Sequence, residues 1–393
     1  MPHWFWHLSC WCSNFHERIM RYFLIAGEAS GDLHASGLMQ ELKRLDCDAG
    51  FRFMGGDLMG AVSEGMVMHY RETSYMLLDV VFHLGRILRN MRRMRSEMKA
   101  FRPHAVILVD YPGFNLRMAR TASRMGLRVF YYISPKVWAW NQRRVRVLKR
   151  YTDRIFVIFP FEQEFYRRFR MQVEYFGNPL VDAVADFKKR FRGTGQWKRK
   201  HGLDEKPLVA LLAGSRKKEI EAMLPVMVRV AGNYPGFRFV VAGAPSIDPG
   251  FYQPFIRGTP VKLVQGETYE LLDSAFAGMI TSGTATLEAA LLEVPQVVLY
   301  KTSWPAYFLA KRLISVNFIS LVNLIYGDRL VEEIIQKDLY RRAGREMSRL
   351  LNEQDYRARM LKGYREIREK LGREGVPGRI AERMMQILKG EKE

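Results

Sequence analysis

The sequence predicts an α/β protein whose two Rossmann-like domains face each other across a cleft. Short apolar runs rich in β-branched and aromatic residues alternate with stretches of helical period, which is typical of βαβ units around a buried parallel sheet. A polar, basic interval interrupts this alternation once, and a second alternating set follows it. The chain of 393 residues is long enough for two domains of ordinary size.

The first alternating set predicts a domain over residues 20–185. Its strands are expected at the runs "YFLIAG", "AVILVD", "VFYYIS", "RIFVIF" and "VEYFGNP". We expect residues 1–19 to be an unstructured extension, because Met20 directly precedes the first strand and offers another start of translation. The interval 186–206 lacks apolar periodicity and predicts an interdomain linker with a short helix.

The second set predicts a domain over residues 207–364. Its strands are expected at the runs "PLVALLAGSR", "FRFVVAGAP", "VKLVQG", "FAGMITSG" and "PQVVLYK". The tail is charged with a helical pattern, and we expect its last part, residues 365–393, to cross back onto the first domain. Ligands of open parallel sheets bind beyond the carboxyl ends of the strands, so functional residues are expected there.

The charge of the chain indicates an anionic partner. Lys and Arg number 62 against 41 Asp and Glu, a formal net charge of +21. Nucleic acid, an anionic membrane and phosphorylated substrates all fit such an excess. The three cysteines form neither a CxxC pair nor a Cys/His cluster of metal-ligand spacing. This excludes a zinc site or a disulfide framework from the predictions and favours a reducing cytosol.

Two strand-to-helix loops of the second domain have the composition of a phosphate site. In "MITSGTATLEAALLE", small and hydroxylated residues open a helix whose free N–H groups and dipole favour a phosphate, and a carboxylate follows one turn later, where it can accept hydrogen bonds from ribose hydroxyls. In "LLAGSRKKEI", a guanidinium at a strand end can clamp phosphate. The alternatives are a helix N-cap and a surface arginine at a turn. The candidate residues are Ser282, Gly283, Thr284, Thr286, Glu288, Gly214, Ser215 and Arg216.

The first domain carries polar residues at two strand ends. In "GEASGD", carboxylates occupy the positions at which a dinucleotide-binding loop would hold a pyrophosphate. The loop is therefore predicted to accept hydrogen bonds from sugar or amide groups, and the alternative is that it caps a helix. In "DYPGFN", Asp110 is a candidate general base or a turn cap. Trp138 and Trp140 of "SPKVWAW" could form a platform for a sugar or belong to the core. The other candidates are Glu28, Ser30, Gly31, Asp32 and Asn115.

Residues 76–101 combine apolar positions at helical spacing with a dense arginine cluster. No apolar run is long enough to span a bilayer. The segment could lie in a membrane interface with its arginines on anionic headgroups, or pack on the core with a solvated basic face. The candidate membrane-contact residues are Leu77, Val81, Phe82, Arg86, Arg89 and Arg93.

Seven motifs, taken in order, resemble the lipid-A-disaccharide synthase family. The resemblance runs from Met20 to about Ile387, with one departure at Ala213, where the family pattern has proline. The motifs are "GEASGD", "DYPGFN", "SPKVWAW", "GNPLVD", "GSR", "SGTATLE" and "LVNLI". The fourth adds Asn178 to the candidates on the acceptor side. The last contains Asn323, which sits in an apolar context and therefore either caps local backbone or faces the cleft.

The resemblance implies a GT-B fold and an inverting transfer. No DxD-like carboxylate pair is placed to hold Mg²⁺, so the sequence predicts that the transfer requires no metal and no other cofactor. The 6-hydroxyl of 2,3-diacylglucosamine 1-phosphate would attack UDP-2,3-diacylglucosamine to give a β-1,6 disaccharide and UDP. It places the UDP-sugar in the second domain and the acceptor largely in the first. Asp110, Arg216 and Asn323 match positions that the family needs for activity.

The family resemblance also implies a location and leaves rivals open. It implies a cytoplasmic enzyme, peripheral on the anionic inner-membrane surface; an oligomer stays open. No nucleic-acid partner is expected, because the arginines at 86–95 interleave with aliphatic residues instead of stacking aromatics and no recognisable reader motif appears. The nearest rival is another GT-B enzyme of a UDP-amino sugar, such as a peptidoglycan transferase or a 2-epimerase. Two alternative functions from other classes are also compatible with the basic charge: a nucleic-acid-binding protein and a peripheral membrane scaffold.

Overall fold

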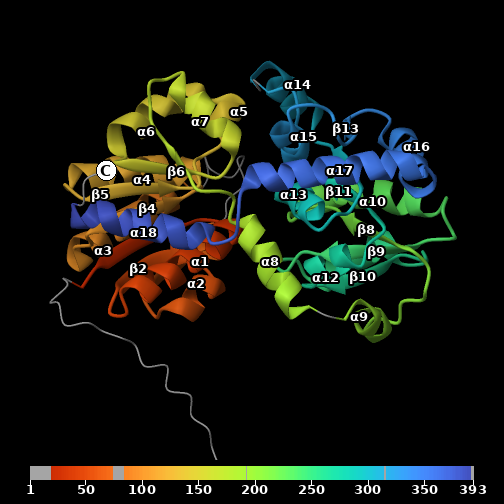
Figure 1. The fold of residues 1–393 in the computed structure, drawn as a ribbon, viewed down its shortest axis with the longest axis horizontal. Coiled ribbons are helices and arrows are strands. Elements are labelled where there is room, and N and C mark those ends of the chain that lie inside the picture. The colour runs from red at the N-terminus through yellow and green to blue at the C-terminus, as the bar shows by residue number, and fades with distance from the viewer. Residues whose placement is uncertain (1–18, 74–83, 192, 314–315, 391–393) are drawn as a thin grey trace, which may run out of the picture.

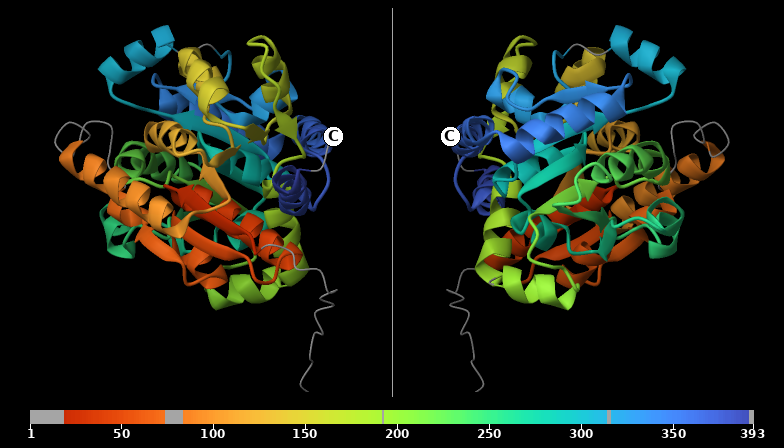
Figure 2. Two further views of the ribbon diagram at one scale, coloured as in Figure 1. Left: turned by 90° about the vertical axis from the view of Figure 1, so that its left-hand side faces the viewer. Right: turned by 90° about the vertical axis from the view of Figure 1, so that its right-hand side faces the viewer.

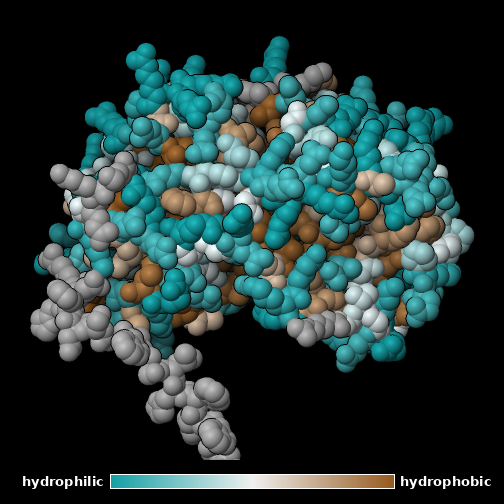
Figure 3. All heavy atoms as spheres, in the orientation of Figure 1, coloured by the Kyte–Doolittle hydropathy of each residue, from teal (hydrophilic) through white to brown (hydrophobic). Residues whose placement is uncertain are grey.

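A computed structural model describes residues 19–73, 84–191, 193–313 and 316–390. In this part of the chain, two parallel β-sheets lie side by side, each with helices on both faces (Figure 1). Views from either end show the helices layered over the sheets (Figure 2). Most side chains on the face shown in Figure 3 are hydrophilic. The protein is therefore a two-domain α/β protein, and the predicted fold class is confirmed.

The first sheet has the strand order β3-β2-β1-β4-β5-β6-β7, and every described pair is parallel. The central strands β1 and β4 are almost wholly buried, which their unbroken apolar runs require. The strands are β1 (Arg21–Ala26), β2 (Gly50–Gly55), β3 (Met66–His69), β4 (Ala105–Val109), β5 (Arg128–Tyr132), β6 (Arg154–Val157) and β7 (Glu174–Tyr175).

The helices of the first domain cover both faces of this sheet (Figure 1). They are α1 (Ala29–Leu45), α2 (Asp57–Val62), α3 (Leu84–Phe101), α4 (Pro112–Arg124), α5 (Val137–Trp140), α6 (Val145–Tyr151) and α7 (Pro160–Arg167). Strands β2 and β3 were not among the predicted runs. The β3 segment has only four residues, and the β2 segment "GFRFMG" is bounded by glycines and contains a charged residue, so the apolar signal of both is weaker than that of the central strands.

The second sheet repeats the plan with the order β10-β9-β8-β11-β12-β13. Its strands are β8 (Leu208–Leu212), β9 (Arg238–Gly243), β10 (Lys262–Gln265), β11 (Ala277–Thr281), β12 (Gln296–Tyr300) and β13 (Glu333–Ile335). Its helices are α10 (Lys217–Ala231), α11 (Gln253–Ile256), α12 (Thr268–Asp273), α13 (Thr284–Leu291), α14 (Trp304–Leu313), α15 (Leu321–Tyr326), α16 (Leu339–Asn352) and α17 (Gln354–Leu371). The edge strand β13 was not predicted, because three residues carry no periodicity.

The chain passes between the domains twice, and the two passages touch. The outward passage leads into α8 (Leu180–Arg190), after which α9 (Thr194–Lys200) packs on the second domain. The return passage leads into α18 (Val376–Lys389), which packs on α1. The Asp182 carboxylate accepts hydrogen bonds from the N–H groups of Gly375 (2.5 Å) and Val376 (3.3 Å). The first turn of α18 is thereby capped by the outward passage.

Candidate functional site

The two sheets bring their topological switch points together. Strand order reverses between β1 and β4 in the first sheet and between β8 and β11 in the second. Loops at such points form ligand sites in doubly wound sheets. Glu28 follows β1 and Arg216 follows β8, and the Arg216 Nη2 atom lies 3.6 Å from the Glu28 Oε1 atom. The candidate site is therefore the space between these four strand ends.

Asp110 follows β4 in a strained backbone conformation. Asp110 and Tyr111 have φ values of 41° and 48°, in the left-handed region that non-glycine residues seldom adopt. Such residues cost about 1–3 kcal/mol each and cluster at functional sites. The Asp110 carbonyl accepts hydrogen bonds from the Tyr131 hydroxyl (2.6 Å) and the Asn115 Nδ2 atom (2.9 Å). These contacts hold the strained backbone in place.

The environment of Asp110 suits a general base. The pKa of its carboxyl is raised to about 6, mainly by burial; Lys136 and the Tyr111 N–H act to lower this pKa, and Glu28 acts to raise it. A base of this pKa is ionised near neutral pH and accepts a proton readily. Lys136 is a functional candidate that the sequence reasoning missed, although it lies within the "SPKVWAW" motif.

We expect the turnover of the protein to fall as the pH drops through about 6. A base must be deprotonated, so kcat/KM should rise with pH through the pKa of Asp110. Lys136→Met removes a charge that lowers this pKa and should therefore move the acidic limb to higher pH. A pH–rate profile of both proteins checks this; an acidic limb that stays in place in Lys136→Met would contradict the assignment.

Asn115 was predicted on the acceptor side, and the structure gives it a positioning role. Its fully buried amide donates to the carbonyls of Ile25 (3.2 Å), Val109 (3.1 Å) and Asp110 (2.9 Å). It thus fastens the ends of β1 and β4 to each other. Because it is 0% exposed, its side chain is closed to a ligand in the cleft.

The "GEASGD" loop divides its carboxylates between two roles. Asp32 is buried, and its oxygens accept hydrogen bonds from the N–H groups of Gly56 (2.7 Å), Leu58 (3.1 Å) and Met59 (3.2 Å). It therefore caps α2, and the predicted contact with a sugar does not describe it. Gly31 is buried, whereas Glu28 and Ser30 are exposed and stay candidates for the acceptor side.

Trp138 and Asn178 are structural residues as well. Trp138 is 5% exposed, and its indole N–H donates to the Glu162 Oε1 atom (3.1 Å). Burial raises the pKa of Glu162 to about 7. Asn178 is fully buried and donates to the Ile158 carbonyl (3.0 Å) beside the passage between the domains. Neither side chain is placed to contact an acceptor; the side chain of Trp140 lies outside the described residues.

The loop between β11 and α13 is open at its tip. A Cβ atom added to Gly283 would meet nothing within 4 Å, so a ligand can approach this backbone. The Ser282 hydroxyl donates to the Ile319 carbonyl (2.9 Å) and the Thr286 hydroxyl to the Gly283 carbonyl (2.8 Å). These hydroxyls therefore shape the loop. The groups that can bind an anion here are the N–H groups at the start of α13, next to Thr284.

Glu288 lies one turn into α13 and is held by a residue that the sequence reasoning missed. The Tyr269 hydroxyl donates to the Glu288 Oε1 atom (2.9 Å). Burial raises the pKa of Glu288, while this hydrogen bond lowers it. The Phe187 ring of α8 packs edge-on against Tyr269, with centroids 5.5 Å apart. Tyr269 thus fixes Glu288 and connects it to the passage between the domains.

Tyr269→Phe should weaken the binding of UDP roughly tenfold, since a hydrogen bond to a charged group contributes about 1.5–3 kcal/mol. Loss of this hydrogen bond should also raise the pKa of Glu288. As the pH is lowered, Glu288 should therefore become protonated, and the UDP affinity should fall, at a higher pH than in the unchanged protein. Calorimetric titration with UDP across pH measures both effects. Tyr356→Phe is the matched control, because Tyr356 makes the same kind of bond to Glu346 away from this loop. Equal UDP affinities of the two variants would contradict this role of Tyr269.

Gly214, Ser215 and Arg216 form a tight turn before α10. Gly214 has a φ of +111°, and a Cβ atom there would lie 2.6 Å from Glu219. Glu219 accepts a hydrogen bond from the Ser215 N–H (3.0 Å) and pairs with the Arg216 Nη1 atom (3.2 Å). The Arg216 side chain is 59% exposed. The guanidinium is therefore oriented by a carboxylate from each domain and is accessible to an anion.

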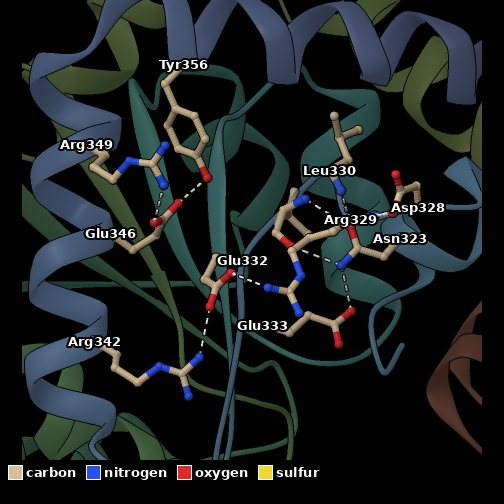
Figure 4. A network of polar contacts seen from close by, with 11 residues as sticks. Asn323, Asp328, Arg329, Leu330, Glu332, Glu333, Arg342, Glu346, Arg349 and Tyr356 are labelled. Atoms are coloured by element: carbon tan, nitrogen blue, oxygen red, sulfur yellow. Dashed lines mark hydrogen bonds and ion pairs between the residues drawn. The ribbon is translucent and has the colours of Figure 1, made fainter. Parts of the chain in front are cut away.

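Asn323 is fully buried, and Figure 4 shows it hydrogen-bonded to Leu330 and Glu333. Its Oδ1 atom accepts hydrogen bonds from the N–H groups of Leu330 (2.9 Å) and Val331 (3.0 Å), and its Nδ2 atom donates to Glu333 (2.9 Å). Glu333 also accepts from the Ile319 N–H (2.9 Å), and the Ile319 carbonyl holds Ser282. The local-backbone alternative therefore describes the contacts of Asn323, which hold the loop at Leu330 in place.

The candidate membrane segment is described only from α3 onward. Leu77, Val81 and Phe82 lie outside the described residues. Arg86, Arg89 and Arg93 are exposed, whereas Met94 and Met98 on the apolar side are buried against the first sheet. In the described part of α3, the apolar side therefore packs against the first domain, and the arginine side faces solvent.

The described ranges, which omit residues 1–18, 74–83, 192, 314–315 and 391–393, lack two features. They contain no group of three or more His, Cys, Asp or Glu residues arranged to hold a metal ion. Nor do they contain a helix with the length and hydropathy that crossing a bilayer requires.

The chain matches the family described as lipid-A-disaccharide synthetase over residues 22–382. The chain belongs to the lipid-A-disaccharide synthase family. A lipid-A-disaccharide synthase of Geobacter sulfurreducens is 37% identical over 377 residues, which are 94% of this chain and 97% of that protein. One of Myxococcus xanthus is 37% identical over 380 residues, with the same coverage. The family assigns the chain to the glycosyltransferases.

Solved structures support the fold of this synthase family member. A UDP-GlcNAc 2-epimerase from Neisseria meningitidis, bound to UDP-GlcNAc, aligns with a TM-score of 0.64 at 14% identity, over 95% of this chain and all of that one. The Methanocaldococcus jannaschii UDP-GlcNAc 2-epimerase, in complex with UDP-GlcNAc and UDP, gives 0.64 at 13% identity, over 93% and 99%. At this identity the likeness shows the GT-B fold alone. Family membership favours the transferase over the epimerase alternative.

Proposed function

We propose that the protein joins UDP-2,3-diacylglucosamine to 2,3-diacylglucosamine 1-phosphate, giving the β-1,6 disaccharide 1-phosphate and UDP with inversion. The observation that supports this reaction is the placement of Asp110 and Arg216 on opposite sides of the cleft, linked through Glu28. One side supplies a base of raised pKa, and the other supplies an exposed cation beside a helix N-terminus. An inverting transfer needs this pair of groups.

In the proposed step, Asp110 takes the proton of the acceptor 6-hydroxyl as its oxygen attacks the anomeric carbon. The bond from that carbon to the UDP oxygen breaks, and its electron pair leaves with UDP. Arg216 and the N-terminal N–H groups of α13 stabilise the charge that develops on the diphosphate. Glu288 is placed to receive the ribose hydroxyls. Because these groups supply the compensating charge, we expect full activity in the presence of EDTA.

We further propose that the protein works at the anionic, cytoplasmic face of the inner membrane. Both sugars carry acyl chains, so the enzyme has to meet them at a bilayer. The support comes from the exposed arginines of α3, which favour anionic headgroups by about 1 kcal/mol for each residue near the surface. No role for nucleic acid is proposed.

Mass-resolved product analysis with the purified protein tests this function. The acylated donor and acceptor should give the disaccharide 1-phosphate and one equivalent of UDP. Turnover of UDP-GlcNAc alone, without the acylated sugars, would favour the 2-epimerase or peptidoglycan-transferase alternatives. Absence of UDP release from any donor would contradict an enzymatic function.

A further inference from the structure

Helix α14 of the second domain exposes large aromatic side chains. Trp304 and Phe308 are 47% and 60% exposed. They lie four residues apart, on one side of the helix, and their ring centroids are 5.9 Å apart. A soluble protein usually buries such side chains, and adjacent exposed aromatic rings indicate a contact surface. We call Trp304 and Phe308 the α14 patch.

Exposed cations accompany the α14 patch. Lys301 precedes α14 by three residues and Arg312 lies in its last turn, and both are exposed. The Nζ atom of Lys337, also exposed, lies 6.0 Å from the centroid of the Trp304 ring. Aromatic side chains flanked by Lys and Arg are characteristic of helices that lie in a membrane interface, where the rings enter the headgroup region and the cations meet anionic lipids.

The position of α14 fits the same surface as α3. Both views in Figure 2 show α14 and the N-terminal end of α3 extending from the same side of the molecule, one from each domain. The α3 helix adds exposed arginines and Leu88, which is 42% exposed. A single flat surface could therefore touch both helices. A second copy of the chain is a poorer occupant, because two aromatic side chains expose only on the order of 200–300 Å², against about 800 Å² per partner in a standard protein interface.

We propose that the α14 patch is a second membrane contact, through which the nucleotide-binding domain docks on an anionic bilayer. This proposal deepens the proposed function and rests on its membrane part. Contact through both domains would hold the cleft between them close to the lipid surface from which acylated sugars come. The contact through α14 is apolar with a cationic rim, whereas the contact through α3 is mainly electrostatic. Salt should therefore weaken the α3 contact more than the α14 contact.

Vesicle co-sedimentation of the full chain tests the α14 patch. With vesicles of phosphatidylethanolamine and phosphatidylglycerol, the double variant Trp304→Ser, Phe308→Ser should bind roughly ten- to a hundredfold more weakly, since two partly exposed rings lose their transfer into the bilayer. Leu58→Ser is the matched control, because Leu58 is similarly exposed (46%) on α2. The control should bind vesicles as the unchanged protein does.

Two further measurements separate the outcomes. Calorimetry with UDP and turnover of detergent-dispersed substrates should be unchanged in the double variant. Unchanged vesicle binding would overturn the proposal, and so would a shift from dimer to monomer in analytical ultracentrifugation, which would assign the patch to a second copy. If the unchanged protein binds vesicles through the patch but releases no UDP from acylated substrates, the proposed reaction fails while the α14 contact stands.

Discussion

Replacement of Asp110 with asparagine is expected to lower kcat by about 10²- to 10⁴-fold, the range that general-base catalysis contributes. The amide cannot take the proton of the attacking hydroxyl. Asparagine is the appropriate substitute because, like aspartate, it tolerates the left-handed conformation that residue 110 adopts, with a φ of 41°. The binding of UDP should be retained, because its groups lie in the other domain. Single-turnover kinetics and calorimetry with UDP measure the two quantities.

Asp57→Asn is the matched control for this variant. Asp57 lies in the same domain, and its carboxylate is largely exposed beside Arg71. The control should keep full activity. A fully active Asp110→Asn would remove Asp110 from the role of base, and a parallel loss of UDP affinity and thermal stability would indicate that residue 110 supports the fold instead.

Arg216→Ala should lower kcat by about 10²- to 10³-fold, comparable to the loss of one preorganised donor to a developing oxyanion. It should also weaken UDP binding, because the guanidinium pairs with the diphosphate before the transfer as well as during it. Arg216→Lys should restore little of the rate, since an ammonium group cannot form the paired hydrogen bonds of a guanidinium. Steady-state kinetics and UDP calorimetry check both variants.

The chain offers a matched control in the same domain. Arg329 pairs with Glu332 at 3.6 Å with i,i+3 spacing, as Arg216 pairs with Glu219, and its side chain is 70% exposed. Arg329→Ala should leave kcat and UDP affinity unchanged. If it were as impaired as Arg216→Ala, general loss of positive charge would explain the effect.

The sequence predicted the strands of both sheets except β2, β3 and β13, because the apolar run of a buried strand is a local signal. Buried parallel strands are continuous apolar runs, and the motif loops at their ends follow directly from chain order. Asp110, Arg216 and the Gly283 loop could therefore be assigned to strand ends from the amino-acid sequence alone. Lys136 stood inside a recognised motif, but its effect on Asp110 depends on how two loops meet in space.

The roles of the buried polar residues could not be predicted, because their partners are distant in the sequence or depend on a loop conformation. Asp32 caps a helix that begins at Asp57, and Asn178 binds a carbonyl near the end of another strand. The Asn323 side-chain oxygen accepts a hydrogen bond from the Leu330 N–H, which depends on the conformation of the loop that contains Leu330. In each case a functional position and a structural position have the same sequence pattern, since buried polar groups must be hydrogen-bonded wherever they lie.

A crystal structure with UDP soaked into the cleft would show whether the second domain holds the nucleotide between its switch-point loops, facing Asp110. We expect the diphosphate on the N–H groups at the start of α13 within reach of Arg216, and the ribose hydroxyls on Glu288. Diphosphate density bound instead to the first domain, or away from both second-domain loops, would contradict this expectation.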